Sequence, residues 1–249
     1  MTTTSQFRTI RTRDVIAAEV TKILTHPVIL YALGAVLIAN IFLAVVASNE
    51  AIRFGTGNDT APLSAFAAVM FAPIYAFLIV PVYAAASEYQ DGQVRISLSA
   101  VPHRARLFTG KLAATMAVVV PAALVALLPA RVILGLHHGL STPDMLADIG
   151  RWVAVYLAMS LFVFGIAGVL RSTLAPLVLL TTLAVFVNAG FLQWPDGLRL
   201  LPDQAAMNVL GTPSYEVMEL PAGIATIVLT GWAALAVVAY MVAFLSRDS

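Results

Sequence analysis

The chain has 249 residues, of which 60% are hydrophobic and 11% charged, and its formal net charge is +1. Soluble globular domains carry about 25% charged residues because their surface faces water. This composition therefore excludes an ordinary soluble domain and predicts a protein with most of its surface in a lipid bilayer. The chain has no cysteine, which excludes disulfides, thiolate metal sites and cysteine nucleophiles, and its small net charge does not predict a nucleic-acid partner.

Residues 1–27 are predicted to form a cytoplasmic N-terminal region. It does not resemble a cleavable signal peptide, because residues 1–13 are polar and the first long apolar run begins only near Val28. From Val15 to Leu24 apolar residues recur at helical spacing, and Pro27 ends the pattern. This pattern predicts an amphipathic helix on the cytoplasmic membrane surface. The alternative is a short soluble helix packed on the protein.

Six segments are apolar over about 20 residues, the length that crosses about 30 Å of hydrocarbon. None contains Asp, Glu, Lys, Arg or His, and they cover residues 28–48, 62–87, 112–130, 152–170, 174–193 and 221–246. Backbone in lipid must satisfy its own hydrogen bonds, so the segments are predicted to be helices. The alternating polarity of a β-barrel is absent. The predicted fold is an all-α membrane protein with a six-span transmembrane domain over residues 28–246.

The basic residues predict the orientation of these spans. If the N-terminus is cytoplasmic, ten of the 14 Lys and Arg residues are inside and four are outside. The inside residues are Arg8, Arg11, Arg13, Lys22, Arg95, Arg104, Arg106, Lys111, Arg171 and Arg247, and the outside residues are Arg53, Arg131, Arg151 and Arg199. Because cytoplasmic loops carry an excess of Lys and Arg, both termini, including the tail 247–249, are predicted to lie on the cytoplasmic side of the cell inner (plasma) membrane.

The longest predicted cytoplasmic connection, residues 88–111, contains four of the ten inside basic residues. Gly92 is placed to end the helix that leaves the second span, and Pro102 interrupts the chain before the third. Between them lies a short apolar stripe formed by Val94, Ile96 and Leu98. A loop that only contacts lipid headgroups would explain the arginines, but it would not explain this stripe.

This connection and the N-terminal helix resemble segments of the ABC-2 family of exporter permeases, whose loop follows a pattern of Glu, Gly-Thr, Leu, Pro, Arg and Lys. The loop residues that match in order and approximate spacing are Glu88, Gly92, Leu98, Pro102 and Lys111. Glu19 and Lys22 match a Glu-x-x-Lys pattern before the first span. Gln93 stands where Thr is usual, and Arg104 and Arg106 lie on either side of the position of the usual Arg.

The resemblance implies a permease subunit of an ATP-driven exporter, with an interfacial N-terminal helix and short outer helices over residues 194–220. It also implies a second permease copy, identical or different, with spans two and five at the interface, and a separate ABC ATPase. The residues that it implies for coupling to the ATPase are Glu88, Gly92, Arg95, Leu98 and Pro102. The chain has no G-x-x-x-x-G-K-[ST] phosphate loop, so ATP and Mg are expected on the partner, and the chain itself is expected to be neither an enzyme nor a cofactor-binding protein.

Two other functions remain open, an ion-coupled secondary transporter and a non-transporting membrane scaffold. Ion-coupled transport usually requires ionisable groups near the midplane, and the predicted spans have none. Asn40 and Asn188, the most polar side chains deep in the spans, either bond across helices or line a substrate path. His137 and His138 point in different directions on most backbones, so no metal site is predicted. The expected substrate is amphiphilic or hydrophobic, such as a drug, a peptide or a lipid.

Overall fold

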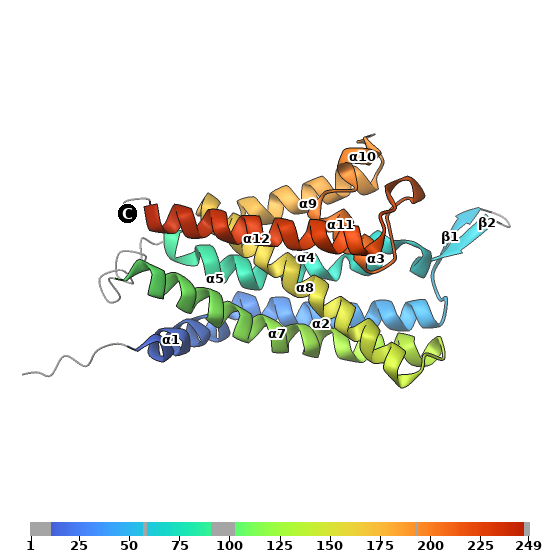
Figure 1. Cartoon of the computed structure of the whole chain (residues 1–249). Helices are drawn as coiled ribbons and strands as arrows, with labels where there is room; N and C mark the ends of the chain where they lie inside the picture. The colour runs from blue at the N-terminus through green and yellow to red at the C-terminus, as the bar shows by residue number, and fades with distance from the viewer. Residues whose placement is uncertain (1–10, 57–58, 91–102, 193, 247–249) are drawn as a thin grey trace, which may run out of the picture.

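A computed structural model describes residues 11–56, 59–90, 103–192 and 194–246 as an elongated bundle of helices (Figure 1). Five helices in this part of the chain are long and apolar enough to cross a membrane. They are α2 (Pro27–Ser48), the run Ala67–Tyr89, α7 (Arg104–His137), α8 (Thr142–Leu170) and α12 (Ala222–Ser246). The structure therefore has the architecture of a multi-pass helical membrane protein.

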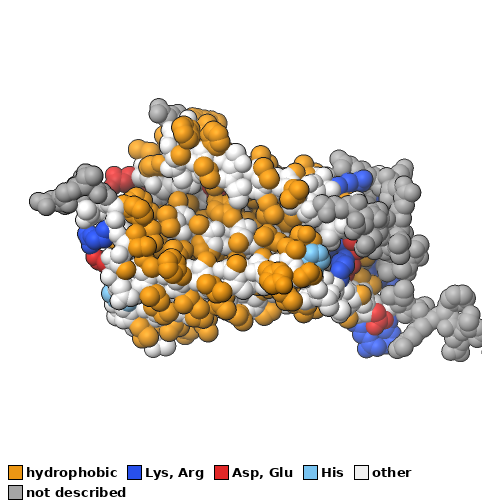
Figure 2. Space-filling view, turned by 180° about the vertical axis from the view of Figure 1, so that it is seen from behind, with side chains coloured by type: hydrophobic (Ala, Val, Ile, Leu, Met, Phe, Trp, Pro, Cys, Tyr) orange, Lys and Arg blue, Asp and Glu red, His pale blue; other side chains and the backbone are white. Residues whose placement is uncertain are grey.

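The distribution of side chains on the surface agrees with this architecture. Figure 2 shows hydrophobic side chains over the middle of the molecule and charged side chains gathered at its two ends. Large apolar residues such as Tyr31, Ile38 and Phe42 on α2 are exposed. A soluble monomer rarely exposes so large a continuous apolar surface, whereas hydrocarbon solvates it without cost.

The helix α9 (Ala175–Asn188) is shorter than the span predicted over 174–193. Its 14 residues reach about 21 Å, so it is not among the five long helices. It ends because Gly190 adopts a left-handed backbone conformation with φ of 74°. The amide of Phe191 then donates to the carbonyl of Phe186, and the two rings lie 5.6 Å apart. This bonding pattern is a Schellman cap, which a glycine at this position favours.

The second membrane-crossing helical run begins at Ala67, later than the start predicted at residue 62. The strands β1 (Arg53–Thr56) and β2 (Asp59–Pro62) pair as an antiparallel hairpin, with Arg53 opposite Pro62. This hairpin is an exception to the all-α prediction, and the turn-forming sequence Gly-Thr-Gly-Asn-Asp explains it. After η1 (Leu63–Ala65), the helical run comprises α3 (Ala67–Phe71), α4 (Pro73–Phe77) and α5 (Ile79–Gln90).

The N-terminal helix α1 (Thr12–Thr25) ends where the sequence predicts. His26 is extended, with ψ of 119°, because the ring of Pro27 disfavours a helical conformation in the residue before it. The helix packs along the first half of α7 through a buried face that contains Val15, Glu19 and Ile23. This packing holds α1 against the bundle, and its interfacial position stays a prediction.

A close contact in the core joins α8 to α12. A Cβ atom at Gly165 would lie 2.3 Å from the backbone of Ala236, and one at Gly168 would lie 2.4 Å from the ring of Tyr240. Glycine at both positions therefore lets the two helices approach closely, as is common between membrane helices. The rings of Phe108, Phe164 and Tyr240 pack together beside this contact.

The connection between α9 and α12 forms short helices, as predicted for residues 194–220. They are α10 (Pro195–Leu198), α11 (Pro202–Val209) and η2 (Glu216–Met218). Residues 202–208 are all buried, because α11 packs against α12 and α8. Figure 1 shows that this connection lies toward the end of the bundle opposite α1 and the last turn of α12, so both ends of the described chain lie at one end of the molecule. We call that end the terminal end.

Candidate functional site

A cluster of four charged side chains lies at the terminal end of the bundle, and it joins three helices. Glu19 and Lys22 come from α1, Glu88 from α5 and Lys111 from α7. The Nζ atom of Lys22 lies 2.6 Å from a carboxylate oxygen of Glu19 and 2.6 Å from one of Glu88. The Nζ atom of Lys111 lies 2.9 Å from the other carboxylate oxygen of Glu88 and 3.6 Å from Glu19. We call these four residues the charge cluster.

The charge cluster is shielded from solvent. Only 2% of the Lys111 side chain and 6% of the Glu88 side chain are exposed. Lys111 also donates a hydrogen bond of 3.2 Å to the carbonyl oxygen of Ala84. A charge removed from water is tolerated only when it is paired and hydrogen-bonded. The two carboxylates and two ammonium groups balance one another, so the cluster as a whole carries no net charge.

Lys22 is the most exposed member of the cluster, with 32% of its side chain accessible. Burial acts to lower the pKa of Lys22, but the carboxylates of Glu19 and Glu88 outweigh that effect and hold the pKa above its ordinary value. Lys22 therefore stays charged at neutral pH and continues to bridge α1 to α5.

A glycine lets α1 reach this position. Gly110 precedes Lys111 on α7, and a Cβ atom at Gly110 would lie 2.7 Å from Cγ1 of Val15. The absent side chain lets α1 pack directly on α7. Val15 and Glu19 lie on the same face of α1, four residues apart, so the contact at Gly110 brings Glu19 toward Lys111.

The structure brings together residues that the sequence analysis assigned to separate features. Glu88 was placed among the coupling residues, and Glu19 and Lys22 in the N-terminal helix. Lys111 entered only as a match to the family pattern, and its burial was missed. The other predicted coupling residues, Gly92, Arg95, Leu98 and Pro102, lie in segment 91–102, outside the described residues. The charge cluster joins the two helices that flank this segment, since α5 ends at Gln90 and α7 begins at Arg104.

The two asparagines of the predicted substrate path have different surroundings. Asn40 is buried in α2, and its amide donates to the carbonyl of Val36 in the same helix. Asn188 is half-buried at the end of α9 and lines a cavity of about 340 Å³ together with Tyr75 and Thr181. Asn188 therefore lies beside a cavity, as a residue of the predicted substrate path would.

A second polar group, which the sequence analysis missed, lies on α11. Asp203 is 2% exposed, and one of its carboxylate oxygens accepts a hydrogen bond of 3.1 Å from Gln204. Its other oxygen has no hydrogen-bond partner among the described residues. Burial therefore raises the pKa of Asp203 above its ordinary value. Nearby, Asn208 donates to the carbonyl of Met218 and accepts from the amide of Leu220, which fixes the chain that leads to α12.

The described residues contain no group of three or more His, Asp or Glu side chains that could hold a metal ion. The charge cluster offers ion pairs between helices rather than a nucleophile or a metal site. No protein-family model matches the chain, and no curated protein matches it significantly.

Proposed function

We propose that the chain is the permease subunit of an ATP-driven transporter of the ABC-2 type, which exports an amphiphilic or hydrophobic substrate across the plasma membrane. The observation that carries the proposal is the charge cluster. Its ion pairs join α5, which precedes segment 91–102, and α7, which follows it, to the N-terminal helix through Glu88 and Lys111. The sequence resemblance assigns that same segment to contact with an ATPase.

The charge cluster gives this coupling a physical route. A force applied to segment 91–102 acts first on the ends of α5 and α7, because these helices flank the segment. Glu88 and Lys111 pass that displacement to α1 through Lys22 and Glu19. The attraction between opposite charges is stronger in a poorly hydrated site than in water, so the three helices are expected to move together.

The proposed topology has six spans with both termini in the cytoplasm, and α9 is the fifth span along the chain, in addition to the five long helices. A span this short is accommodated by bilayer thinning or by oligomerisation. The main neighbours of α9 are α8 and α5, and its residues Val178, Leu179 and Val185 are exposed. A second permease copy packed on this face would cover them. It would also enclose the cavity beside Asn188, which becomes part of the substrate path in this proposal.

Purification of the full-length chain from its own host in a mild detergent tests the proposal. We expect a second protein with a G-x-x-x-x-G-K-[ST] motif to co-purify at fixed stoichiometry and to hydrolyse ATP. A chain that purifies without such a protein, and that transports when reconstituted alone, would contradict the proposal.

One observation favours the second candidate, an ion-coupled secondary transporter. Asp203 is a buried ionisable group of the kind that such transporters use, and the apolar pattern of the predicted spans did not reveal it. The two candidates respond differently to Asp203→Asn. An ATP-driven permease keeps its transport rate in this variant, whereas a proton-coupled transporter loses its dependence on the proton gradient.

A further inference from the structure

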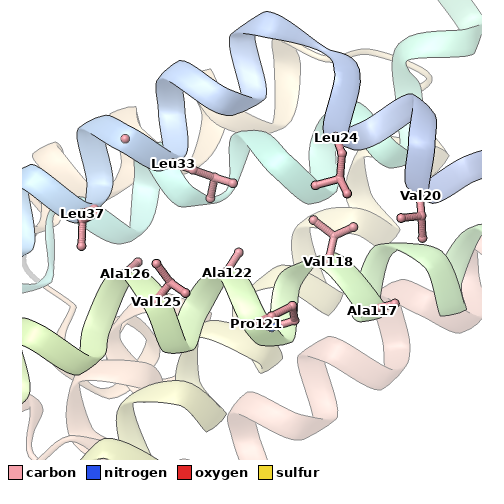
Figure 3. A pocket seen from close by; sticks show the side chains of 11 residues that line it. Val20, Leu24, Leu33, Leu37, Ala117, Val118, Pro121, Ala122, Val125 and Ala126 are labelled. Atoms are coloured by element: carbon pink, nitrogen blue, oxygen red, sulfur yellow. The ribbon is translucent and has the colours of Figure 1, made fainter.

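The cavity of about 340 Å³ beside Asn188 has polar groups in its wall. Tyr75, Thr181 and Asn188 line it together with alanine and valine side chains. A groove of about 400 Å³ between α1, α2 and α7 has only apolar side chains in its wall (Figure 3). The few polar groups in a mostly apolar cavity decide what it binds, so the bonds that hold Asn188 bear on the use of the cavity.

The side-chain amide of Asn188 has a fixed orientation. Its Nδ2 atom donates a hydrogen bond of 2.7 Å to the carbonyl oxygen of Ala184, one turn earlier in α9. Its Oδ1 atom lies 2.7 Å from the Oγ atom of Ser214. An amide oxygen can only accept a hydrogen bond, so the hydroxyl of Ser214 donates its hydrogen to Asn188. This bond joins α9 to the connection that leads to α12.

Ser214 has a second polar contact, which its single hydrogen cannot also serve. Its Oγ atom lies 2.8 Å from Oε1 of Gln204, which is another acceptor. Because Asn188 takes the hydrogen of Ser214, Gln204 has to be the donor in this contact. The two ends of an amide have nearly the same shape, and the hydrogen bonds around it decide which end faces which partner. A half-turn of the Gln204 amide brings its NH2 group to Ser214 and gives both contacts one hydrogen.

The half-turn also brings the amide oxygen of Gln204 to Asp203. One carboxyl oxygen of Asp203 lies 3.1 Å from the amide, so two acceptors would face each other there. They attract each other only if a hydrogen lies between them, and the carboxyl of Asp203 is the group that can carry it. With Asp203 protonated, each hydrogen bond in the chain from Asp203 to Asn188 has one donor and one acceptor.

The burial of Asp203 favours the same neutral form. The residue is 2% exposed, and its second carboxyl oxygen has no hydrogen-bond partner among the described residues. Burying an unpaired carboxylate costs far more free energy than burying a neutral acid. The position of Asp203 in the first turn of α11 favours the charged form. That effect is small beside the loss of hydration, and burial raises the pKa of Asp203 in spite of it.

The helices around α11 do not supply a counter-charge. Among the described residues, no basic group forms an ion pair with Asp203. Helices α3 and α12 pack on α11 and contain no Asp, Glu, Lys, Arg or His. Tyr75 of α4 interacts electrostatically with Asp203, but a tyrosine is uncharged at neutral pH. The charged residues of α8 have partners on α7, on α8 or in the turn before it, and they are Asp144, Asp148 and Arg151.

We propose that Asp203 is a proton-binding site that is occupied at neutral pH, and that its proton keeps Ser214 bonded to Asn188 at the cavity. When the proton leaves, the amide of Gln204 has to turn back and donate to the carboxylate. Its oxygen then competes with Asn188 for the one hydrogen of Ser214. The polar wall of the cavity therefore changes with the charge of Asp203. The inference does not depend on how transport is driven, so it and the proposed function can fail separately.

Infrared spectroscopy of the full-length protein in lipid nanodiscs tests the protonation. A protonated carboxyl has a carbonyl stretch that is separate from the bands of carboxylates and amides. At neutral pH we expect this band in the wild type, a shift of the band when aspartate is labelled with carbon-13, and its loss in Asp203→Asn. Asp196→Asn is the matched control, because Asp196 is 80% exposed, and it should keep the band. A wild type without a protonated aspartate band, which needs no variant to establish, or a band that persists in folded Asp203→Asn would overturn the inference.

Solid-state NMR of labelled asparagine side chains tests the link to the cavity. The signal of Asn188 is identified by its loss in Asn188→Gln. We expect it to shift at the pH at which the Asp203 band disappears, and to lose this shift in Ser214→Ala, which keeps the band. Ser64→Ala is the matched control, because Ser64 lies on η1 outside the chain of hydrogen bonds, and it should keep the shift. Folding of each variant is checked by size-exclusion chromatography. An Asn188 signal that does not respond to pH while the band titrates, or that responds equally in Ser214→Ala, would overturn the link.

Discussion

The Nζ atom of Lys111 lies 2.9 Å from a carboxylate oxygen of Glu88, although 23 positions separate the two residues in the chain. Between them lies segment 91–102, so this ion pair joins the helix that precedes the segment to the helix that follows it. The other carboxylate oxygen of Glu88 binds Lys22 of α1. The helices α1, α5 and α7 therefore meet at one carboxylate.

Glu88→Gln is expected to destabilise the protein strongly. The substitution leaves Lys111 buried, with only the more distant carboxylate of Glu19 to balance it. Removing one partner from a buried ion pair typically costs about 3–5 kcal/mol. Chemical unfolding in detergent measures this cost, and the variant Glu88→Gln with Lys111→Met should recover part of it because no buried charge is left unpaired at these two positions.

The matched control for this prediction is Glu50→Gln, which removes the exposed ion pair between Glu50 and Arg53. Exposed pairs contribute less than about 1 kcal/mol. Equal losses of stability in Glu88→Gln and Glu50→Gln would show that the charge cluster does not hold the helices together.

The contact between α8 and α12 gives a second prediction. Gly165→Ala places a methyl group 2.3 Å from the backbone of Ala236, so the helices must separate, at a cost of about 1–3 kcal/mol. Gly150 lies on the same helix, and an added Cβ atom there meets nothing within 4 Å. Gly150→Ala should instead stabilise α8 by up to about 1 kcal/mol, since alanine is the better helix former. Denaturant midpoints in detergent distinguish the two, and a neutral Gly165→Ala would contradict the packing.

The apolar pattern of the sequence predicted most of the helices, because a membrane helix is specified by its length and its lack of charge. It placed the start of the second span too early, since Pro62 and Leu63 are apolar but belong to the hairpin and η1. It also overestimated α9, because residues 189–192 remain apolar after the cap at Gly190. At the site, spacing along the chain predicted Glu19, Lys22 and Glu88 individually. Their meeting with Lys111 depends on how α1, α5 and α7 pack, which hydrophobicity does not specify.

The stability of the protein should depend on pH through Asp203. Burial raises the pKa of this carboxyl above its value in the unfolded chain, which is about 3.9, so the folded state binds the proton more tightly. The stability that the protonated carboxyl contributes is fully present below the pKa of the unfolded chain. It is lost as the pH rises through the higher pKa of the folded state. Asp203→Asn should therefore be more stable than the wild type at pH 7 to 8, with a difference that shrinks toward pH 4.

Thermal unfolding in detergent between pH 4 and pH 8 measures this difference. Asp196→Asn is the control, because Asp196 is 80% exposed beside Arg199 and should show little change with pH. An Asp203→Asn protein that is less stable than the wild type at every pH would mean that Asp203 is charged and paired in the folded state.

Cysteine cross-linking tests the proposed second copy. The chain has no cysteine, so a single introduced cysteine reports only on its own position. Val178→Cys and Val185→Cys on the exposed face of α9 are expected to form disulfide-linked dimers in the membrane, because the proposed interface brings the two copies of this face together. Ile227 on α12 is 72% exposed, and Ile227→Cys should stay monomeric. Equal dimer yields at positions 185 and 227 would reject an interface at α9.

Photo-cross-linking from segment 91–102 in intact cells tests the central claim most directly. With p-benzoylphenylalanine in place of Leu98, we predict a covalent product with a cytoplasmic protein that carries a G-x-x-x-x-G-K-[ST] motif and hydrolyses ATP. The same probe at Val217, in the connection before α12, should give no such product. If position 98 yields no ATPase, and a cysteine there reacts with membrane-impermeant reagents added outside the cell, the proposed coupling function is contradicted.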